Sequence, residues 1–293
     1  MRSEEEMMEV ILEAAKGNDL VRAVYMNGSR TNPNVRKDIF QDYDIVYVVT
    51  ETAPFIMDKK WLESFGEMLM MQEPDQNDHM SGEDKDFTMS YGYQMLFKDG
   101  NRIDLQIQSI ECASERFLSD KLTIPLMDKD GILPSIESPT DRQYHVKTPT
   151  EGQYFSCCNN FWWCQQNTAK GIWRNELPYA RFMFECVIRQ ELDEMVSWWI
   201  GIRTDFQVSA GKLGKYFKDH LPESYWNMYI STCSDGNYQN MWDALFTAGN
   251  LFRMLAREVA ESLSYRYPEE DDRNMSAYLN RVRTLPANAE VIF

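Results

Sequence analysis

Residues 27–49 decide the fold of this chain, and they read NGSRTNPNVRKDIFQDYDIVYVV. A Gly28-Ser29 turn comes directly after the apolar run of residues 21–26, and a largely polar loop follows it. Asp42 and Asp44 then stand two positions apart, where a second apolar run begins. Because side chains two positions apart on a strand point to the same face, we expect these two carboxylates to lie side by side.

Two neighbouring carboxylates repel each other unless a cation lies between them. Hard divalent cations such as Mg²⁺ prefer oxygen ligands of this kind. The turn at Gly28 and Ser29 can bring backbone N–H groups close to a phosphate, since glycine adopts conformations that other residues avoid. The stretch therefore predicts a metal–nucleotide site that includes Asp42 and Asp44.

A third carboxylate comes from the next expected pair of strands. Residues 87–97 alternate between apolar and polar side chains, and Asp99-Gly100 is a hairpin signal. The return strand, residues 102–108, carries Asp104 on its polar face, and a carboxylate in mid-strand is against propensity. Three carboxylates can hold a pair of divalent ions, which stabilises both the attacking and the leaving oxygen in a displacement at phosphorus. The alternative is a chance coincidence of strand-edge aspartates with an ordinary turn.

The rest of the chain divides into two kinds of sequence. The first part mixes helical and strand patterns: a capping box from Ser3 to Glu6 starts a helix, and the apolar spacing of residues 61–71 predicts another. After the proline-rich residues 125–149 the pattern is helical throughout, over residues 151–170, 177–200, 211–220, 238–265 and 272–283.

We therefore predict an α+β protein of two domains. Residues 1–148 would form a metal- and nucleotide-binding domain with a mixed sheet flanked by helices. Residues 149–293 would form an all-α helical bundle. The paired tryptophans of this second part, Trp162-Trp163 and Trp198-Trp199, are expected in its core.

The composition limits the classes of partner. A formal net charge of −16 argues against nucleic acid as a partner and favours a small cationic molecule. The N-terminus lacks the apolar segment of a signal peptide, and no run approaches the length of a membrane span. The six cysteines show no C-x-x-C spacing and are interpreted as reduced thiols. We expect a cytoplasmic monomer that does not bind membranes.

The site motif resembles that of a known superfamily. Gly-Ser, a dozen residues and then Asp-x-Asp between apolar neighbours is the signature of the nucleotidyltransferases related to DNA polymerase β. The sequence around this motif is similar to that of one branch of the superfamily, the bacterial aminoglycoside 6-adenylyltransferases that modify streptomycin. The similarity extends over nearly the whole chain, and it is carried by residues 25–33, 41–45, 102–105, 126–131, 176–180 and 211–216.

The resemblance implies a reaction in which ATP and an aminoglycoside hydroxyl, at the 6-position of streptomycin, give the adenylylated drug and pyrophosphate. Asp42 and Asp44 would bind Mg²⁺, and Asp104 would either complete the metal site or take the proton of the attacking hydroxyl. Gly28 and Ser29 would cradle the phosphates of ATP. Arg30 would neutralise these phosphates, or it is only a solvated turn residue.

Other residues are expected at the substrates. Lys212 and Lys215, three positions apart on an expected helix, could clamp the triphosphate. Carboxylates and aromatic faces suit the guanidinium groups of streptomycin. The candidates are Glu83 and Asp86 in the first domain and Trp173, Glu176 and Glu185 in the second.

Two alternatives stay open at this point. The first is a nucleotidyltransferase of the same fold that acts on another small acceptor. The second is a nucleotide-binding regulatory module without turnover, which the presence of all three aspartates disfavours.

Overall fold

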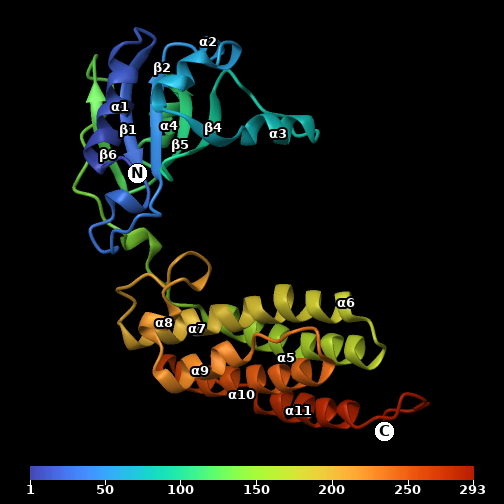
Figure 1. The fold of residues 1–293 in the computed structure, drawn as a ribbon. Coiled ribbons are helices and arrows are strands. Elements are labelled where there is room, and N and C mark those ends of the chain that lie inside the picture. Colours follow the sequence, from blue (N-terminus) through green and yellow to red (C-terminus); the bar gives the residue numbers. More distant parts are fainter. The chain divides into compact units, whose positions relative to one another are not determined.

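The structure is a computed structural model that describes residues 1–293 (Figure 1). The chain divides into two compact units, Met1–Gln143 and Tyr144–Phe293. Each unit is described by itself below. The first is a mixed sheet with helices and the second is entirely helical, which confirms the predicted α+β fold class.

A six-stranded sheet organises the first unit, with the strands in the order β3-β4-β5-β2-β1-β6. All neighbours are antiparallel except β2 and β5, which are parallel. The strands are β1 (Val21–Asn27), β2 (Tyr43–Val49), β3 (Met68–Gln72), β4 (Ser90–Phe97), β5 (Arg102–Ser109) and β6 (Thr123–Asp128). The helices are α1 (Glu4–Lys16), α2 (Ala53–Met57), α3 (Pro74–Met80) and α4 (Ile110–Arg116), with 3₁₀ turns at Ser29–Thr31, Lys60–Phe65 and Arg142–Tyr144.

The central strand β2 is buried on both faces, as its continuous apolar sequence predicts. On one face Ile45 and Tyr47 join the larger core, which includes Met7 and Ile11 of α1. On the other face Val46 and Val48 join a smaller core that includes Phe117, the residue after α4. The predicted capping box of α1 is present, with Ser3 and Glu6 bonded reciprocally.

The strand register brings the site residues together. Asn27, the last residue of β1, lies opposite Asp44 on β2, and Asp44 lies opposite Asp104 on β5. The Gly28 turn therefore begins directly beside the first carboxylate-bearing strand. The predicted Asp-Gly hairpin joins β4 to β5, and its register places Gln94 opposite Asp104.

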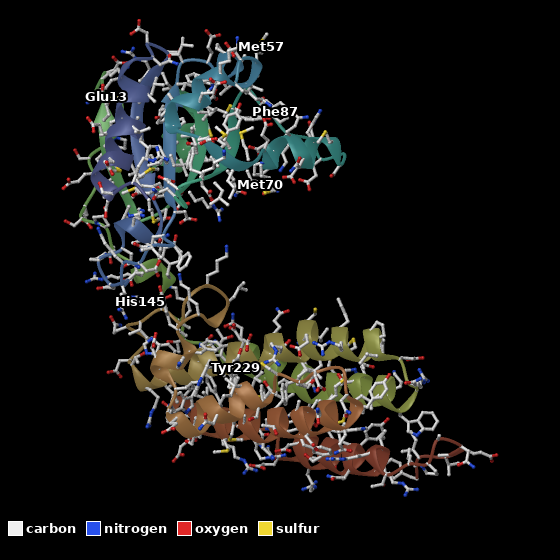
Figure 2. The ribbon with its side chains drawn as sticks, viewed as in Figure 1. Glu13, Met57, Met70, Phe87, His145 and Tyr229 are labelled. Atoms are coloured by element: carbon white, nitrogen blue, oxygen red, sulfur yellow. The ribbon has the colours of Figure 1, made fainter.

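The second unit is built on four long helices, α5 (Glu151–Trp173), α7 (Arg189–Arg203), α10 (Tyr238–Leu263) and α11 (Glu269–Arg283). The shorter elements are α6 (Leu177–Phe182), a π-helical turn (Met183–Ile188), a 3₁₀ turn (Lys212–Gly214), α8 (Phe217–His220) and α9 (Glu223–Ser231). Phe161 of α5 stacks on Phe252 of α10 with ring centroids 3.7 Å apart. Tyr229 points into this unit, where its hydroxyl donates to Asp193 (Figure 2).

Three local predictions are wrong. Residues 61–71 form no helix: they form a 3₁₀ turn that ends at Gly66, where φ is +122°, and most of the edge strand β3. The methionines of β3 suit a helix, but its backbone pairs with the open edge of β4. Met70 of this edge strand is exposed (Figure 2). Trp163 is 65% exposed, whereas Trp162, Trp198 and Trp199 are buried as predicted.

The expected helix over residues 211–220 is also wrong. Gly211, Leu213 and Gly214 all have positive φ values, which interrupt the backbone, and only the short α8 remains. All six cysteines are free. None of the helices is long and apolar enough to cross a membrane.

Candidate active site

The site starts at the turn after β1. Gly28 has φ +80° and donates its backbone N–H to the carbonyl of Leu122, and its own carbonyl accepts from Thr31. These bonds fix the 3₁₀ turn of Ser29–Thr31 against β6. The turn therefore has a defined shape at the point where β1 meets Asp44.

Asp42, Asp44 and Asp104 form one cluster. Each offers a carboxylate oxygen within 4.8 Å of those of the other two, and all three are half-buried. Asp44 and Asp104 reach this point because β2 and β5 are parallel neighbours in register. Asp42 joins them from the residue just before β2 begins. The three carboxylates predicted from the sequence therefore do lie together.

Glycine is required at position 28 by the approach of Asp44. A Cβ atom at this position would lie 2.0 Å from Oδ2 of Asp44, which no side chain can tolerate without displacing the carboxylate. The positive φ adds strain for any other residue. The turn and the carboxylate are thus packed against each other with no intervening side chain.

The electrostatics of the cluster favour a cation. Burial, followed by the charges of Asp42 and Asp104, raises the pKa of Asp44 to about 7. A carboxylate with a raised pKa is one whose charge is poorly compensated. Oxygen donors that converge in this way fit a hard divalent ion such as Mg²⁺.

Arg102 places a positive charge beside the carboxylates of Asp104 and Asp42. Its Nε and Nη2 donate to the two oxygens of Asp104, at 2.7 and 2.6 Å, and its Nε lies 4.0 Å from Oδ2 of Asp42. The side chain lies two residues before Asp104 on β5, on the same face of the strand. It holds Asp104 in a bidentate ion pair.

A pocket of about 320 Å³ is lined by two of the three carboxylates, Asp44 and Asp104. Several of its lining residues escaped the sequence analysis, namely Asn27, Tyr93, Gln94, Gln106 and Asp120. The alternation of β4 and β5 could have pointed to the two glutamines, which share the polar face with Asp104. Asp120 has no local sequence signal. Its Oδ1 accepts from the backbone of Leu122 and the side chain of Gln143, and its charge also raises the pKa of Asp44.

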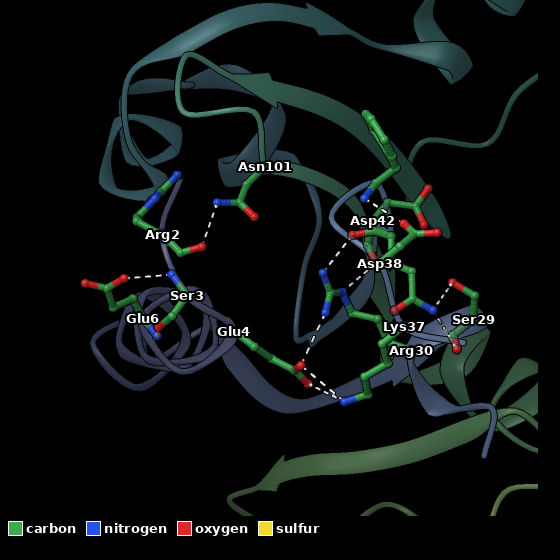
Figure 3. A network of polar contacts seen from close by, with 12 residues as sticks. Arg2, Ser3, Glu4, Glu6, Ser29, Arg30, Lys37, Asp38, Asp42 and Asn101 are labelled. Atoms are coloured by element: carbon green, nitrogen blue, oxygen red, sulfur yellow. Dashed lines mark hydrogen bonds and ion pairs between the residues drawn. The ribbon is translucent and has the colours of Figure 1, made fainter. Parts of the chain in front are cut away.

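The structure places Arg30 inside the loop that leads to Asp42 (Figure 3). Its side chain is only 7% exposed, and its guanidinium donates to the backbone carbonyls of Gln41 and Asp42. It is therefore not a solvated turn residue. Ser29 lies beside it, with its carbonyl and hydroxyl near the side-chain amide of Gln41.

Glu83 and Asp86 do not line the pocket at Asp44 and Asp104. Both lie in the loop after α3. Glu83 pairs with Lys85, and the carboxylate of Asp86 accepts from the backbone and hydroxyl of Thr88. These hydrogen bonds lower the pKa of Asp86. Their expected contact with the acceptor stays a prediction.

Lys212 and Lys215 belong to the helical unit and do not share a helix face. Leu213, between them, has φ +56° and breaks the 3₁₀ turn. Lys212 lines a pocket of about 490 Å³ together with Lys147 and Trp198, whereas the ammonium of Lys215 lies over the ring of Tyr216.

The three acceptor candidates of the helical unit are dispersed within it. Trp173, near the end of α5, lines a pocket of about 250 Å³ with Lys170 and Arg174. Glu176 is exposed at the start of α6. Glu185 forms an ion pair with Arg189 at 2.7 Å. No pocket of this unit is lined by all three.

Comparison with known proteins gives consistent results. A family model described as Streptomycin adenylyltransferase matches residues 1–282. The chain is similar to the aminoglycoside 6-adenylyltransferases of Campylobacter jejuni (39% identical, 96% of each chain) and Bacillus subtilis strain 168 (39%, 93% of this chain and 95% of the relative). It is also similar to that of Staphylococcus aureus (34%, covering 92% and 94%). A crystal structure of an aminoglycoside 6-adenyltransferase from Bacillus subtilis covers 97% of this chain at 34% identity, with a TM-score of 0.48.

Proposed function

The chain belongs to the streptomycin adenylyltransferase family, an aminoglycoside nucleotidyltransferase family, and on this premise we propose that it transfers AMP from ATP to the 6-hydroxyl of streptomycin. Pyrophosphate would be the second product, and Mg²⁺ the metal. The observation that carries the proposal is the convergence of Asp42, Asp44 and Asp104 beside the Gly28 turn.

The proposed roles follow from the positions of these residues. Asp42, Asp44 and Asp104 would hold Mg²⁺, which neutralises charge on the phosphates and on the attacking and leaving oxygens when it is bound. The turn of Gly28 and Ser29 would contact the β- and γ-phosphates through its backbone and hydroxyl groups. The polar pocket floor, with Gln94 and Gln106, would face the reacting groups.

The reaction is a displacement at the α-phosphorus. The acceptor oxygen forms a bond to this phosphorus, the bond to the bridging oxygen breaks, and pyrophosphate leaves with the electron pair. The hydroxyl proton goes to a carboxylate or to water. Asp104 is the candidate for that proton if it does not complete the metal site, and in either role its carboxylate must separate from Arg102.

The acceptor is a cation in this proposal, and the charge of the chain agrees with it. The formal net charge is −16, and Asp120 adds a third carboxylate to Asp44 and Asp104 in the lining of the pocket. An acidic pocket attracts a polycationic drug and disfavours a nucleic-acid acceptor. The contacts proposed for Glu83, Asp86, Trp173, Glu176 and Glu185 would come from outside this pocket.

An assay of pyrophosphate release tests the proposal. The purified chain with ATP and Mg²⁺ should release pyrophosphate only when streptomycin is added, and the product should be streptomycin plus one AMP by mass spectrometry. Omission of Mg²⁺, or its replacement by a chelator, should stop the reaction. Turnover with a different aminoglycoside alone would favour another acceptor, and absence of turnover with any of them would refute the proposal.

A further inference from the structure

Arg30 contacts the segment that carries Asp42 at three consecutive residues. Its Nε donates to the carbonyl of Asp42 at 2.9 Å, and its Nη2 donates to the carbonyl of Gln41 at 2.7 Å. The carbon at the centre of its guanidinium lies 3.7 Å from the centroid of the Tyr43 ring, which is itself buried. One side chain therefore contacts three consecutive residues around the Asp42 carboxylate.

The other end of the guanidinium faces helix α1. Its Nη1 lies 3.5 Å from a carboxylate oxygen of Glu4, the first residue of that helix. Lys37, from the same loop as Arg30, donates to both oxygens of Glu4 at 3.2 Å (Figure 3). Because Met7 and Ile11 anchor α1 in the core, Glu4 is a fixed point against which Arg30 can hold the loop.

These contacts engage all three nitrogens of the guanidinium. Both directions in which it donates carry partners within the protein, and its side chain is 7% exposed. A phosphate-binding arginine would direct its donors at the ligand, whereas the nitrogens of Arg30 are directed at the carbonyls of Gln41 and Asp42 and at Glu4. The planar guanidinium fits two carbonyls and an aromatic face at the same time, which the compact ammonium group of lysine does less well.

We infer that Arg30 is a positioning residue: it fixes the backbone of Gln41 and Asp42, and thereby sets the place of the Asp42 carboxylate in the cluster. It does not bind the triphosphate. The inference rests on the proposed function in one respect only, that Asp42 is a metal ligand.

Metal binding without any substrate tests the inference. Mn²⁺ affinity is measured by titration calorimetry for the wild type, Arg30→Lys and Arg30→Gln, with Arg36→Gln as the control from the same loop, because Arg36 is exposed. Both Arg30 variants should lose about tenfold or more in affinity, as the loss of a residue that supports a metal ligand does. The control should bind as the wild type does. An Arg30→Lys variant with wild-type affinity would overturn the inference.

Steady-state kinetics separate positioning from phosphate binding. If Arg30 is a positioning residue, Arg30→Lys and Arg30→Gln should both lower kcat and leave the KM for ATP little changed. For a phosphate ligand, Lys should largely restore activity and Gln should raise the KM for ATP, which would refute the inference. A wild-type chain that binds no Mn²⁺ would instead count against the proposed function.

A second variant guards against misfolding. Glu4→Gln removes the ion-pair partner of Arg30 and leaves the pocket untouched. The single variant should therefore bind Mn²⁺ more weakly than the wild type. The double variant Arg30→Lys/Glu4→Gln should bind it no more weakly than Arg30→Lys alone. Hydrogen exchange of the backbone amides of residues 41–44 should be faster in each of these variants. Unchanged exchange in Arg30→Lys would contradict the inference.

Discussion

Arg102 and Asp104 face each other on one strand as a bidentate ion pair, with nitrogen–oxygen distances of 2.7 and 2.6 Å. The pair consumes both oxygens of a carboxylate that the proposed function assigns to the metal or to the proton of the acceptor. Arg102 thus occupies the place of a counter-cation within the cluster. Its side chain is 45% exposed, so it can turn outward at little cost.

Removal of this pair should strengthen metal binding. Arg102→Gln should raise Mn²⁺ affinity by about threefold, because an exposed ion pair contributes roughly 0.2–1 kcal/mol and no longer has to be broken. Arg102→Lys keeps the charge but loses the fork. Equal gains in Mn²⁺ affinity in the two variants would show that the bidentate guanidinium of Arg102 competes with the metal for Asp104. An unchanged affinity in both variants would refute this competition.

Gly28→Ala should abolish turnover. The added Cβ would lie 2.0 Å from Oδ2 of Asp44, at a φ of +80°. We expect a loss of about 100-fold or more in kcat/KM, equivalent to roughly 2.7 kcal/mol of barrier. Gly82→Ala is the control, since Gly82 also has a positive φ but has open space around it.

The comparison of these two variants isolates the contact with Asp44. Gly82→Ala should lower stability by about 1 kcal/mol through backbone strain alone and should leave activity intact. Adding Asp44→Ala to Gly28→Ala should restore much of the lost stability without restoring turnover. Wild-type activity in Gly28→Ala would show that the Asp44 carboxylate can move freely.

Stability without metal should fall as the pH rises from about 4 to 7. The pKa of Asp44 is raised to about 7, above its unfolded value near 3.8, so the folded state binds more protons than the unfolded state in this window. The free energy of unfolding then decreases with pH, at most by about 1.4 kcal/mol per pH unit. The stabilisation by the protonated Asp44 carboxyl is fully present below about pH 4 and is lost above about pH 7.

Chemical denaturation at several pH values measures this dependence. Asp44→Asn should flatten the slope, and saturating Mg²⁺ should do the same in the wild type, because a bound cation compensates the charge. Mg²⁺ binding below pH 7 should also release protons. An identical slope in Asp44→Asn would assign the effect to another group.

Substitution of the cluster aspartates should remove activity and keep the fold. Asp42→Asn, Asp44→Asn and Asp104→Asn should each lower kcat by more than about tenfold, since one decade is only ~1.4 kcal/mol of barrier. Circular dichroism should show an intact fold. Asp19→Asn, at an exposed position outside the pocket, is the control. Retention of most activity in a cluster variant would argue against a metal role for that residue.

Lys212→Ala should weaken ATP binding. Lys212 lines a pocket of the helical unit together with a second lysine, Lys147. The KM for ATP should rise by about tenfold, equivalent to ~1.4 kcal/mol. Lys218→Ala, at an exposed position on α8, should change nothing. An unchanged KM in Lys212→Ala would remove this residue from the triphosphate site.

The functional division of the chain into residues 1–148 and 149–293 stays a prediction.

Most helices and strands of the chain could be predicted because their sequence signals are local. The capping box of α1, the apolar run of β2 and the Asp-Gly hairpin each depend on neighbouring residues only. One failure arose where a distant partner decides: residues 68–72 became a strand because β4 offers them an edge. The other arose within the segment itself, where positive φ values at Gly211, Leu213 and Gly214 interrupt the expected helix.

The sequence alone determined which carboxylates belong together, because period-two alternation and the Gly-Ser spacing assign them to faces of strands that must be neighbours. It could not determine what surrounds them. Asp120 reaches the pocket from the loop between α4 and β6, Arg102 pairs with Asp104, and Arg30 points inward to hold the Asp42 backbone. These outcomes depend on strand order and on competition between partners for each charge, and only the tertiary structure settles that competition.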